Sequence, residues 1–186
     1  LYHIGGQSIL WRWARAGAAV LLHEGFAIDE LASDLAARPV THLSLVPAML
    51  ARLLDRGIAP PPTLRAVLIG GAALSRPLYE RASAAGWPLF VSYGMSETAA
   101  MIAVFKTGEG VWHEGLVGRP LPGHECRIGD DGRIRLRGPQ VMAGYLDGSG
   151  PDADGWLTTG DLGEINADGR LTVLGRADDM LISGGR

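Results

Sequence analysis

Apolar residues recur at helical spacing in four segments of the first half of the chain. Residues 7–17 place their large apolar side chains on one helical face, and Gly17 marks the end of that helix. Three further helices are predicted at residues 27–39, 47–57 and 76–85. Pro39 and Pro47 support these bounds, because proline stops a helix from within but is well tolerated at its first position.

Short apolar runs lie between these helices and indicate buried strands. The runs cover residues 18–22, 41–46, 65–71 and 88–92. Strands that alternate with helices of this length are joined by crossovers, which place helices over the sheet. The first half of the chain therefore predicts a parallel sheet covered on both faces.

The pattern changes in the second half of the chain. Residues 123–138 have the pattern of a strand, an Asp-Gly turn and a second strand, and residues 164–176 repeat it around Ala-Asp-Gly. A polar, glycine-rich loop at 144–155 separates the two predicted hairpins. We predict an α/β fold: a parallel sheet with flanking helices over residues 1–114, followed by a small β-barrel-like subdomain over residues 115–177.

The composition excludes several classes of function. The 186 residues contain 17 lysines and arginines against 20 aspartates and glutamates, with no basic cluster, which argues against a nucleic-acid partner. A single cysteine, Cys126, excludes an internal disulfide and indicates a reducing compartment, so we expect a cytoplasmic protein. The histidines lack metal-ligand spacing, and no apolar run reaches the roughly 18–20 residues that cross a bilayer. Nothing in the sequence indicates an oligomeric state.

Glycines at two points of the chain suggest close approach of a ligand. Gly70 and Gly71 close the strand-like run 65–71, and ligands bind beyond the carboxyl ends of parallel strands, where glycine lets the backbone come close. A tight strand-to-helix turn is the alternative. His3 precedes Gly5 and Gly6, where its ring could line a pocket, although a lone histidine is more often structural.

The motif SYGMSET, residues 92–98, follows the next predicted strand and would open onto the same edge of the sheet. Tyr93 offers a ring that can stack on a base, Ser96 a hydroxyl for a phosphate oxygen, and Glu97 a carboxylate for Mg²⁺. A plain turn, or a cap formed by Ser96, would use the same residue types. Two such motifs on successive strands favour one shared binding site.

Two residues of the second half could hold a ribose. Asp161, in a predicted loop with the sequence TTGD, could accept bonds from both ribose hydroxyls, or it could bond only its own backbone. Arg176 offers a fixed fork of donors for ribose or phosphate oxygens. Its alternative is a surface ion pair with Asp178 or Asp179.

Taken together, the ordered motifs resemble the adenylate-forming acyl-CoA synthetases over almost the whole chain. The motifs are LYHIGG, LIGGAAL, SYGMSET, VGRPLPG, GYL, GWLTTGDLG and GRADDMLISGG. Within this family, the compact spacing and the segments GGAAL and SLVPAMLARLL are most similar to the acid–CoA ligases of menaquinone biosynthesis, whose acid is 2-succinylbenzoate.

The resemblance implies a role for each candidate residue. Ser96, at the α-phosphate, and Glu97, as the magnesium ligand, would be the catalytic residues. Asp161 and Arg176 would hold the ribose, and His3 with Gly71 would line the acyl pocket. The nucleotide-binding positions implied by the resemblance are Gly70, Gly71, Ala72, Ser92, Tyr93, Gly94, Met95, Ser96, Asp161 and Arg176.

The resemblance also indicates that other parts contribute to the site. Asp179, within residues 178–186, matches the hinge to a mobile carboxyl-terminal domain. The Ser/Thr-Gly-rich phosphate loop and the carboxyl-terminal lysine that the family uses do not occur in these 186 residues. We expect the chain to be an internal piece of a larger protein and to be inactive by itself.

The expected function of the larger protein is ligation of a carboxylic acid to coenzyme A. ATP and Mg²⁺ would first give an acyl-adenylate and pyrophosphate, and the thiol of coenzyme A would then displace AMP. Alternatives are a ligase for other aryl or fatty acids, or an adenylating enzyme that loads a carrier protein. A non-catalytic nucleotide-binding or scaffold fragment is the third possibility.

Overall fold

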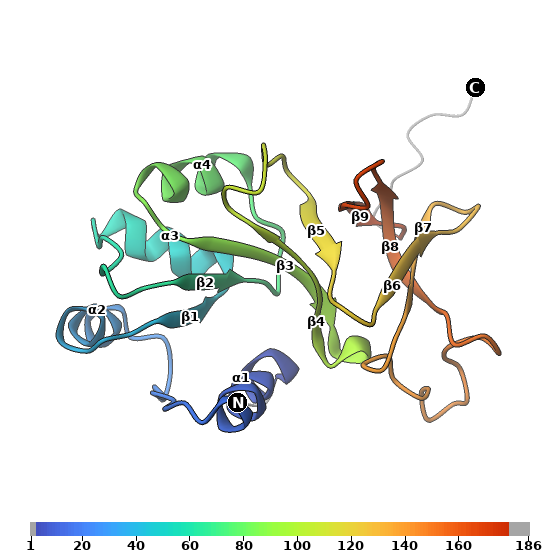
Figure 1. The fold of residues 1–186 in the computed structure, drawn as a ribbon, viewed down its shortest axis with the longest axis horizontal. Coiled ribbons are helices and arrows are strands. Elements are labelled where there is room, and N and C mark those ends of the chain that lie inside the picture. The colour runs from blue at the N-terminus through green and yellow to red at the C-terminus, as the bar shows by residue number, and fades with distance from the viewer. Residues whose placement is uncertain (1–2, 179–186) are drawn as a thin grey trace.

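The structure is a computed structural model that describes residues 3–178, and it is built on one curved sheet (Figure 1). The helices are α1 (Ile4–Ala16), α2 (Ile28–Ala37), α3 (Pro47–Asp55) and α4 (Arg76–Ala84), with a short 3₁₀ turn at Ser96–Thr98. The strands are β1 (His42–Leu45), β2 (Ala66–Ile69), β3 (Leu89–Met95), β4 (Ala100–Lys106), β5 (Leu116–Pro120), β6 (Glu125–Ile128), β7 (Arg133–Arg137), β8 (Leu157–Ile165) and β9 (Leu171–Arg176). Their order in the sheet is β1-β2-β3-β4-β5-β9-β8-β7-β6.

The first three strands confirm the predicted parallel sheet. β1, β2 and β3 run parallel and are joined by α3 and α4, which pack against each other on one face. Helix α1 lies on the opposite face, beside β4 (Figure 1). Gly17 ends α1 in the left-handed conformation, as predicted, and Pro47 opens α3.

The predicted strand at residues 18–22 was wrong. The segment has no regular structure, and Leu21 and Leu22 are 47% and 56% exposed. An apolar run becomes a strand only if a neighbouring strand accepts its hydrogen bonds. In residues 3–178, β1 pairs with β2 alone, and residues 18–22 do not reach its free edge.

Both predicted hairpins are confirmed in the antiparallel half. β6 pairs with β7 across the turn at residues 129–132, and β8 pairs with β9 across the turn at 166–169. β5 pairs with β4 on one side and with β9 on the other. The antiparallel strands from β5 onward therefore belong to the same sheet as the parallel strands. The sheet does not close on itself, because β1 and β6 form its two edges within the described part of the chain. The β-rich half is therefore an open, curved extension of the sheet.

Apolar side chains form one continuous core that reaches both halves of the chain. Trp87 and Phe105 are its largest fully buried members in the first half, and Ile134 and Leu171 belong to the same cluster in the second. Burial of one such side chain stabilises the fold by about 1.5–3 kcal/mol. The boundary near residue 114 is not marked by a break in this core, and the proposed division into subdomains stays a prediction.

Two observations concern the single cysteine and the possibility of a membrane span. Cys126 is a free thiol on β6, and burial raises its pKa to about 11, so it is a poor nucleophile at neutral pH. Among residues 3–178, no helix has both the length and the apolar character needed to span a bilayer.

The motif SYGMSET was predicted to follow the strand at residues 88–92, but its first four residues belong to that strand. β3 continues to Met95, because the antiparallel strand β4 supplies hydrogen-bond partners as far as Ala100. Pairing with a neighbouring strand thus overrides the low strand propensity of the motif. At the bulge between Tyr93 and Gly94 the two strands come so close that a Cβ on Gly94 would lie 1.8 Å from the carbonyl oxygen of Ala100.

We predict that Gly94→Ala lowers the free energy of unfolding by about 3 kcal/mol or more, because the contact is with backbone that cannot move aside without breaking the β3–β4 pair. Denaturant unfolding measures the change. Gly25→Ala is the matched control: no neighbouring heavy atom lies within 4 Å of the added Cβ, so the change should stay within about 0.5 kcal/mol. Equal stability of the two variants would contradict the prediction.

Candidate functional site

A cavity of about 270 Å³ lies where the turn after β3 meets strands β8 and β9. Of the residues predicted to form the site, five line this cavity: Gly94, Met95, Glu97, Asp161 and Arg176. The full lining is Gly94, Met95, Glu97, Tyr145, Leu157, Thr158, Thr159, Gly160, Asp161 and Arg176. Segments that are distant in the sequence therefore converge on one cavity.

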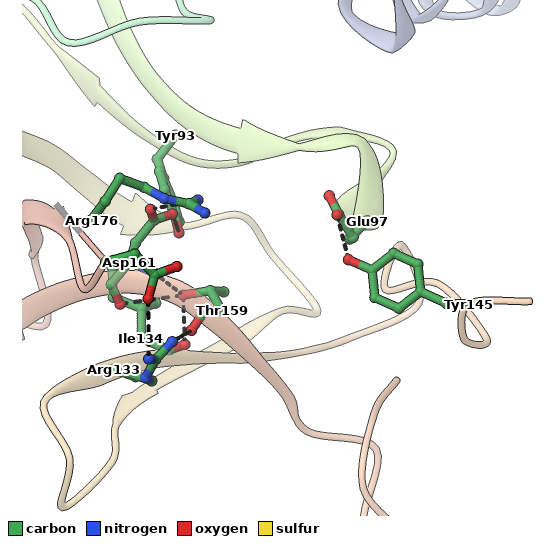
Figure 2. Close-up of polar contacts among 9 residues, drawn as sticks. Tyr93, Glu97, Arg133, Ile134, Tyr145, Thr159, Asp161 and Arg176 are labelled. Carbon is green, nitrogen blue, oxygen red and sulfur yellow. Dashed lines mark hydrogen bonds and ion pairs between the residues drawn. The ribbon is translucent and has the colours of Figure 1, made fainter. Parts of the chain in front are cut away.

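Asp161 is the central charged group of the site. It is 8% exposed, and each of its oxygens has a partner: the Tyr93 hydroxyl donates to Oδ2 at 2.6 Å, and Arg176 Nη1 donates to Oδ1 at 3.2 Å (Figure 2). Burying a carboxylate is costly unless hydrogen-bond donors of this kind satisfy its oxygens. Burial, and next the Asp161 carboxylate, raise the pKa of Tyr93, so its phenol stays protonated and acts as the donor.

Asp161 and Arg176 meet because they face each other across the β8–β9 hairpin. Asp161 was predicted to lie in a loop, but it lies within strand β8, which extends to Leu157 through pairing with β7. Thr159 supports this end of the strand: its Oγ1 donates to the carbonyl of Ile134 at 2.9 Å and accepts the backbone N–H of Asp161 at 3.1 Å. The carboxylate thus sits on a rigid element.

Glu97 lies on the other side of the cavity, in the 3₁₀ turn between β3 and β4. The hydroxyl of Tyr145 donates to its Oε1 at 2.6 Å (Figure 2). The turn is rigid, since the buried Thr98 donates its hydroxyl hydrogen to the Ala100 carbonyl at 2.9 Å and accepts the N–H of Met95 at 3.1 Å. Ala99 and Ala100 both adopt positive φ there, at 48° and 93°, a conformation that costs energy for residues other than glycine.

The glycine motif after β2 lies beside β3 but does not line the cavity. The hydroxyl of Ser92 donates to the carbonyl of Ile69 at 2.9 Å, and a Cβ on Gly70 would lie 2.7 Å from that hydroxyl oxygen. Gly71 has φ of +79°, which glycine adopts without strain, and Ala72 next to it is exposed. The β2 motif and SYGMSET are therefore neighbours, as predicted.

The remaining predicted residues lie outside the cavity. Ser96 is exposed in the 3₁₀ turn next to Glu97, and His3 is exposed at the start of α1. Asp179 lies outside the described residues. A larger hollow of about 420 Å³, beside Arg119 and Arg170 at the turn end of the β8–β9 hairpin, contains none of the predicted residues.

Sequence reasoning missed several polar residues of the cavity, and Tyr145 and Thr159 are the two that make contacts important for the site. Tyr145 lies within the motif GYL, and Thr159 within TTGD. No pattern in the sequence marks either residue as part of the site, because each acquires its role through a contact that forms only in the folded protein. Tyr145 meets Glu97 across 48 positions of the chain, and Thr159 meets Ile134 across 25.

The donors around the cavity suit a cation that takes one ligand from this chain and its other ligands from phosphates and water. Within residues 3–178, no group of three or more histidine, cysteine, aspartate or glutamate side chains could hold a metal ion. Glu97 presents a carboxylate at the cavity, and its Oε2 has no partner among the described residues. Mg²⁺ is often held by one or two carboxylates, with phosphates and water completing its octahedron, so Glu97 fits such an ion.

Comparison with known proteins points to one family. The model of the AMP-binding enzyme family matches residues 1–146. Over its full length the chain is 37% identical to the 2-succinylbenzoate–CoA ligase of Bacillus pumilus, of which it covers 41%. Among solved structures, O-succinylbenzoate coenzyme A synthetase from Bacillus subtilis in complex with ATP and magnesium ion matches with a TM-score of 0.90 at 35% identity, over 100% of this chain and 42% of that one.

The same Bacillus subtilis enzyme in complex with its acyl-adenylate intermediate matches with a TM-score of 0.89 at 35% identity, again over the whole of this chain and 41% of that one. The chain thus spans about two fifths of the length of the relatives that it matches.

We predict that Tyr93→Phe lowers the free energy of unfolding by about 2 kcal/mol, because it leaves a buried oxygen of Asp161 without its donor. Chemical denaturation measures the loss. Tyr79→Phe is the control, since the hydroxyl of this buried residue has only a 3.5 Å contact with Thr107, and its loss should cost less than about 1 kcal/mol. Equal losses in both variants would show that the Asp161 contact has no special importance.

Proposed function

The chain belongs to the AMP-binding enzyme family, and from this premise we propose that the full-length protein is a 2-succinylbenzoate–CoA ligase. The observation that carries the proposal is the convergence of Glu97, Asp161 and Arg176 on one cavity, with Tyr93 bonded to Asp161. Identity of 35–37% to ligases for this acid over the whole chain supports the choice of substrate.

The proposed reaction has two steps. A carboxylate oxygen of the acid attacks the α-phosphorus of ATP, and the bond to the β-phosphate oxygen breaks, which gives the acyl-adenylate and pyrophosphate. The sulfur of coenzyme A, having lost its proton, then attacks the acyl carbonyl carbon, and AMP leaves with the electrons of the acyl–oxygen bond. The first step brings two anions together, so its barrier depends on positioning and on charge stabilisation.

In this proposal Asp161 and Arg176 hold the ribose of ATP. Each Asp161 oxygen already accepts one bond and has a further lone pair for a ribose hydroxyl. Arg176 is more than half exposed and keeps other N–H groups available for oxygens of the nucleotide. Because the Tyr93 hydroxyl is committed to Asp161, its ring is fixed in one orientation and could form one wall of the adenine site.

The rest of the nucleotide site would come from the two neighbouring motifs. Gly70, Gly71 and Ala72 would border the adenine, and Ser92, Gly94 and Met95 would form the floor between base and phosphates. Ser96, exposed next to Glu97, would donate to the α-phosphate. These assignments rest on the match of the motifs and on the position of both motifs at adjacent strand ends.

Glu97 would hold the magnesium ion that accompanies ATP. When bound, the ion would supply positive charge that offsets the repulsion between the acid and the phosphates. The residues of the chain would do the positioning: Glu97 presents a carboxylate from a rigid turn, and the ribose contacts fix the nucleotide relative to it.

His3 and Gly71 would line the acyl pocket, and Asp179 would be the hinge of the proposed domain movement. A cytoplasmic location also remains a prediction, since it rests on the single cysteine Cys126. Coenzyme A and the acid would be the small-molecule partners.

We predict that the full-length protein catalyses ATP–pyrophosphate exchange with 2-succinylbenzoate at least about tenfold faster than with benzoates or fatty acids, because a site that hydrogen-bonds a polar substrate group rejects analogues without it. Exchange of labelled pyrophosphate into ATP across an acid panel measures this, with a reaction lacking acid as blank. Faster exchange with benzoates or fatty acids would replace the proposed substrate. AMP release with a carrier protein but not with coenzyme A would replace the proposed acceptor.

We predict that Glu97→Ala in the full-length protein lowers acid-dependent pyrophosphate exchange at least about a hundredfold, the scale expected for loss of one electrostatic stabiliser. Glu80→Ala is the matched control, because Glu80 is an exposed residue of α4 whose partner is Arg76, and its exchange rate should equal that of the wild type. An unchanged rate for Glu97→Ala would refute the assignment of Glu97.

A further inference from the structure

We infer that Tyr145 is a positioning residue that orients the carboxylate of Glu97 toward the cavity. The inference rests on the proposed function, in which Glu97 holds a divalent cation. Tyr145 and Glu97 both line the 270 Å³ cavity, although they are 48 residues apart in the chain.

The contact between the two side chains fixes which oxygen of Glu97 is available. The Tyr145 hydroxyl donates to Oε1 at 2.6 Å, and Oε2 has no partner among the described residues (Figure 2). Of the two groups the phenol supplies the hydrogen, because a carboxylate can only accept. A cation in the cavity would therefore meet a carboxylate that is held in one orientation.

Tyr145 is presented by a tight loop that fixes its backbone. Its N–H donates to the carbonyl of Ser149 at 2.7 Å, and its carbonyl accepts the N–H of Gly148 at 3.0 Å. Gly144 and Gly150 pack so closely that a Cβ on Gly150 would lie 2.7 Å from the Cα of Gly144. A side chain that orients another group needs such a rigid backbone. If the backbone were mobile, the entropy lost on ordering it would offset the energy of the contact.

The segment that leads into this loop is also attached to the Glu97 turn. The N–H of Met142 donates to the carbonyl of Glu97 at 2.8 Å, and Nε2 of Gln140 donates to the carbonyl of Thr98 at 3.3 Å. The backbones that carry Tyr145 and Glu97 are thus joined near both residues, so their side chains start from fixed positions.

A purely structural role would leave a different signature. Tyr145 is 50% exposed, and a hydrogen bond between solvent-accessible groups contributes little to folding. Removing its hydroxyl should change stability by less than about 1 kcal/mol. Loss of a residue that orients a metal ligand instead lowers metal affinity by about 10–100-fold. Stability and cation affinity therefore separate the two roles.

The test uses Tyr145→Phe in the full-length protein, with Mn²⁺ as the probe in the presence of α,β-methylene-ATP. Electron paramagnetic resonance of free Mn²⁺ gives the affinity, which should fall about tenfold or more. The Mg²⁺ concentration for half-maximal pyrophosphate exchange should rise by a similar factor, while the rate at saturating Mg²⁺ stays within about threefold of wild type. Thermal unfolding checks that the variant is folded.

Two controls make the result specific. Tyr79→Phe removes the hydroxyl of a residue that does not line the cavity and should leave the Mn²⁺ affinity unchanged. In a Glu97→Gln background, Tyr145→Phe should cause no further loss, because the residue acts through that carboxylate. Unchanged Mn²⁺ affinity in Tyr145→Phe, or an equal loss with and without the Glu97 carboxylate, would overturn the inference.

The same measurements separate failure of the inference from failure of the proposed function. A wild-type protein without acid-dependent exchange, whose Mn²⁺ affinity still depends on Tyr145, would refute the ligase but keep the positioning role. Normal exchange with a Mn²⁺ affinity that is insensitive to Tyr145 would refute only the positioning role. Absence of Mn²⁺ binding to the wild type with nucleotide would refute both.

Discussion

The structure depends on one buried carboxylate that joins distant parts of the chain. Asp161 on β8 accepts bonds from Tyr93 on β3 and from Arg176 on β9, so a single side chain connects the end of the parallel strands to the β8–β9 hairpin. A carboxylate is costly to bury unless donors satisfy its oxygens. The site and the fold are therefore held by the same contacts.

This arrangement requires the sheet to curve. β3 and β8 are separated in the sheet by β4, β5 and β9, yet their side chains meet. Irregularities in strand register at Tyr93/Gly94 and Leu116/Gly118 lie between them, and bulges of this kind increase local twist. The absence of a side chain at Gly94 lets β3 and β4 approach closely at the bend, next to the turn that carries Glu97.

The sequence was most informative where structure is decided locally. Pro47 and Gly17 marked helix ends, and the Ala-Asp-Gly turn located the β8–β9 hairpin. Counting outward from that turn would pair Asp161 with Gly175, however, because the sequence does not reveal the irregularity between Leu162 and Gly163 that shifts the register to Arg176. Contacts that depend on the curvature of the whole sheet could not be predicted from the sequence. The bond from Tyr93 to Asp161 spans 68 positions and follows from curvature, which no short motif encodes.

The errors have the same origin. Residues 18–22 are apolar enough for a strand but lack a neighbouring edge, whereas SYGMSET is poor in strand formers but gains β4 as a partner. Tyr145 had no signal before its loop was placed beside Glu97. The most specific sequence information was the order of the motifs, because several weak patterns in a fixed order identify a family even when no one of them does.

The shielded sulfur of Cys126 has a practical consequence. With a pKa of about 11, this thiol will react slowly with maleimides and iodoacetamides at neutral pH, and it is the only cysteine in the 186 residues. A second cysteine introduced at an exposed position, such as Leu174, would therefore take up a fluorophore or spin label selectively without first removing the native one. The hairpin that ends at Arg176 could thus be followed in solution by a single attached reporter.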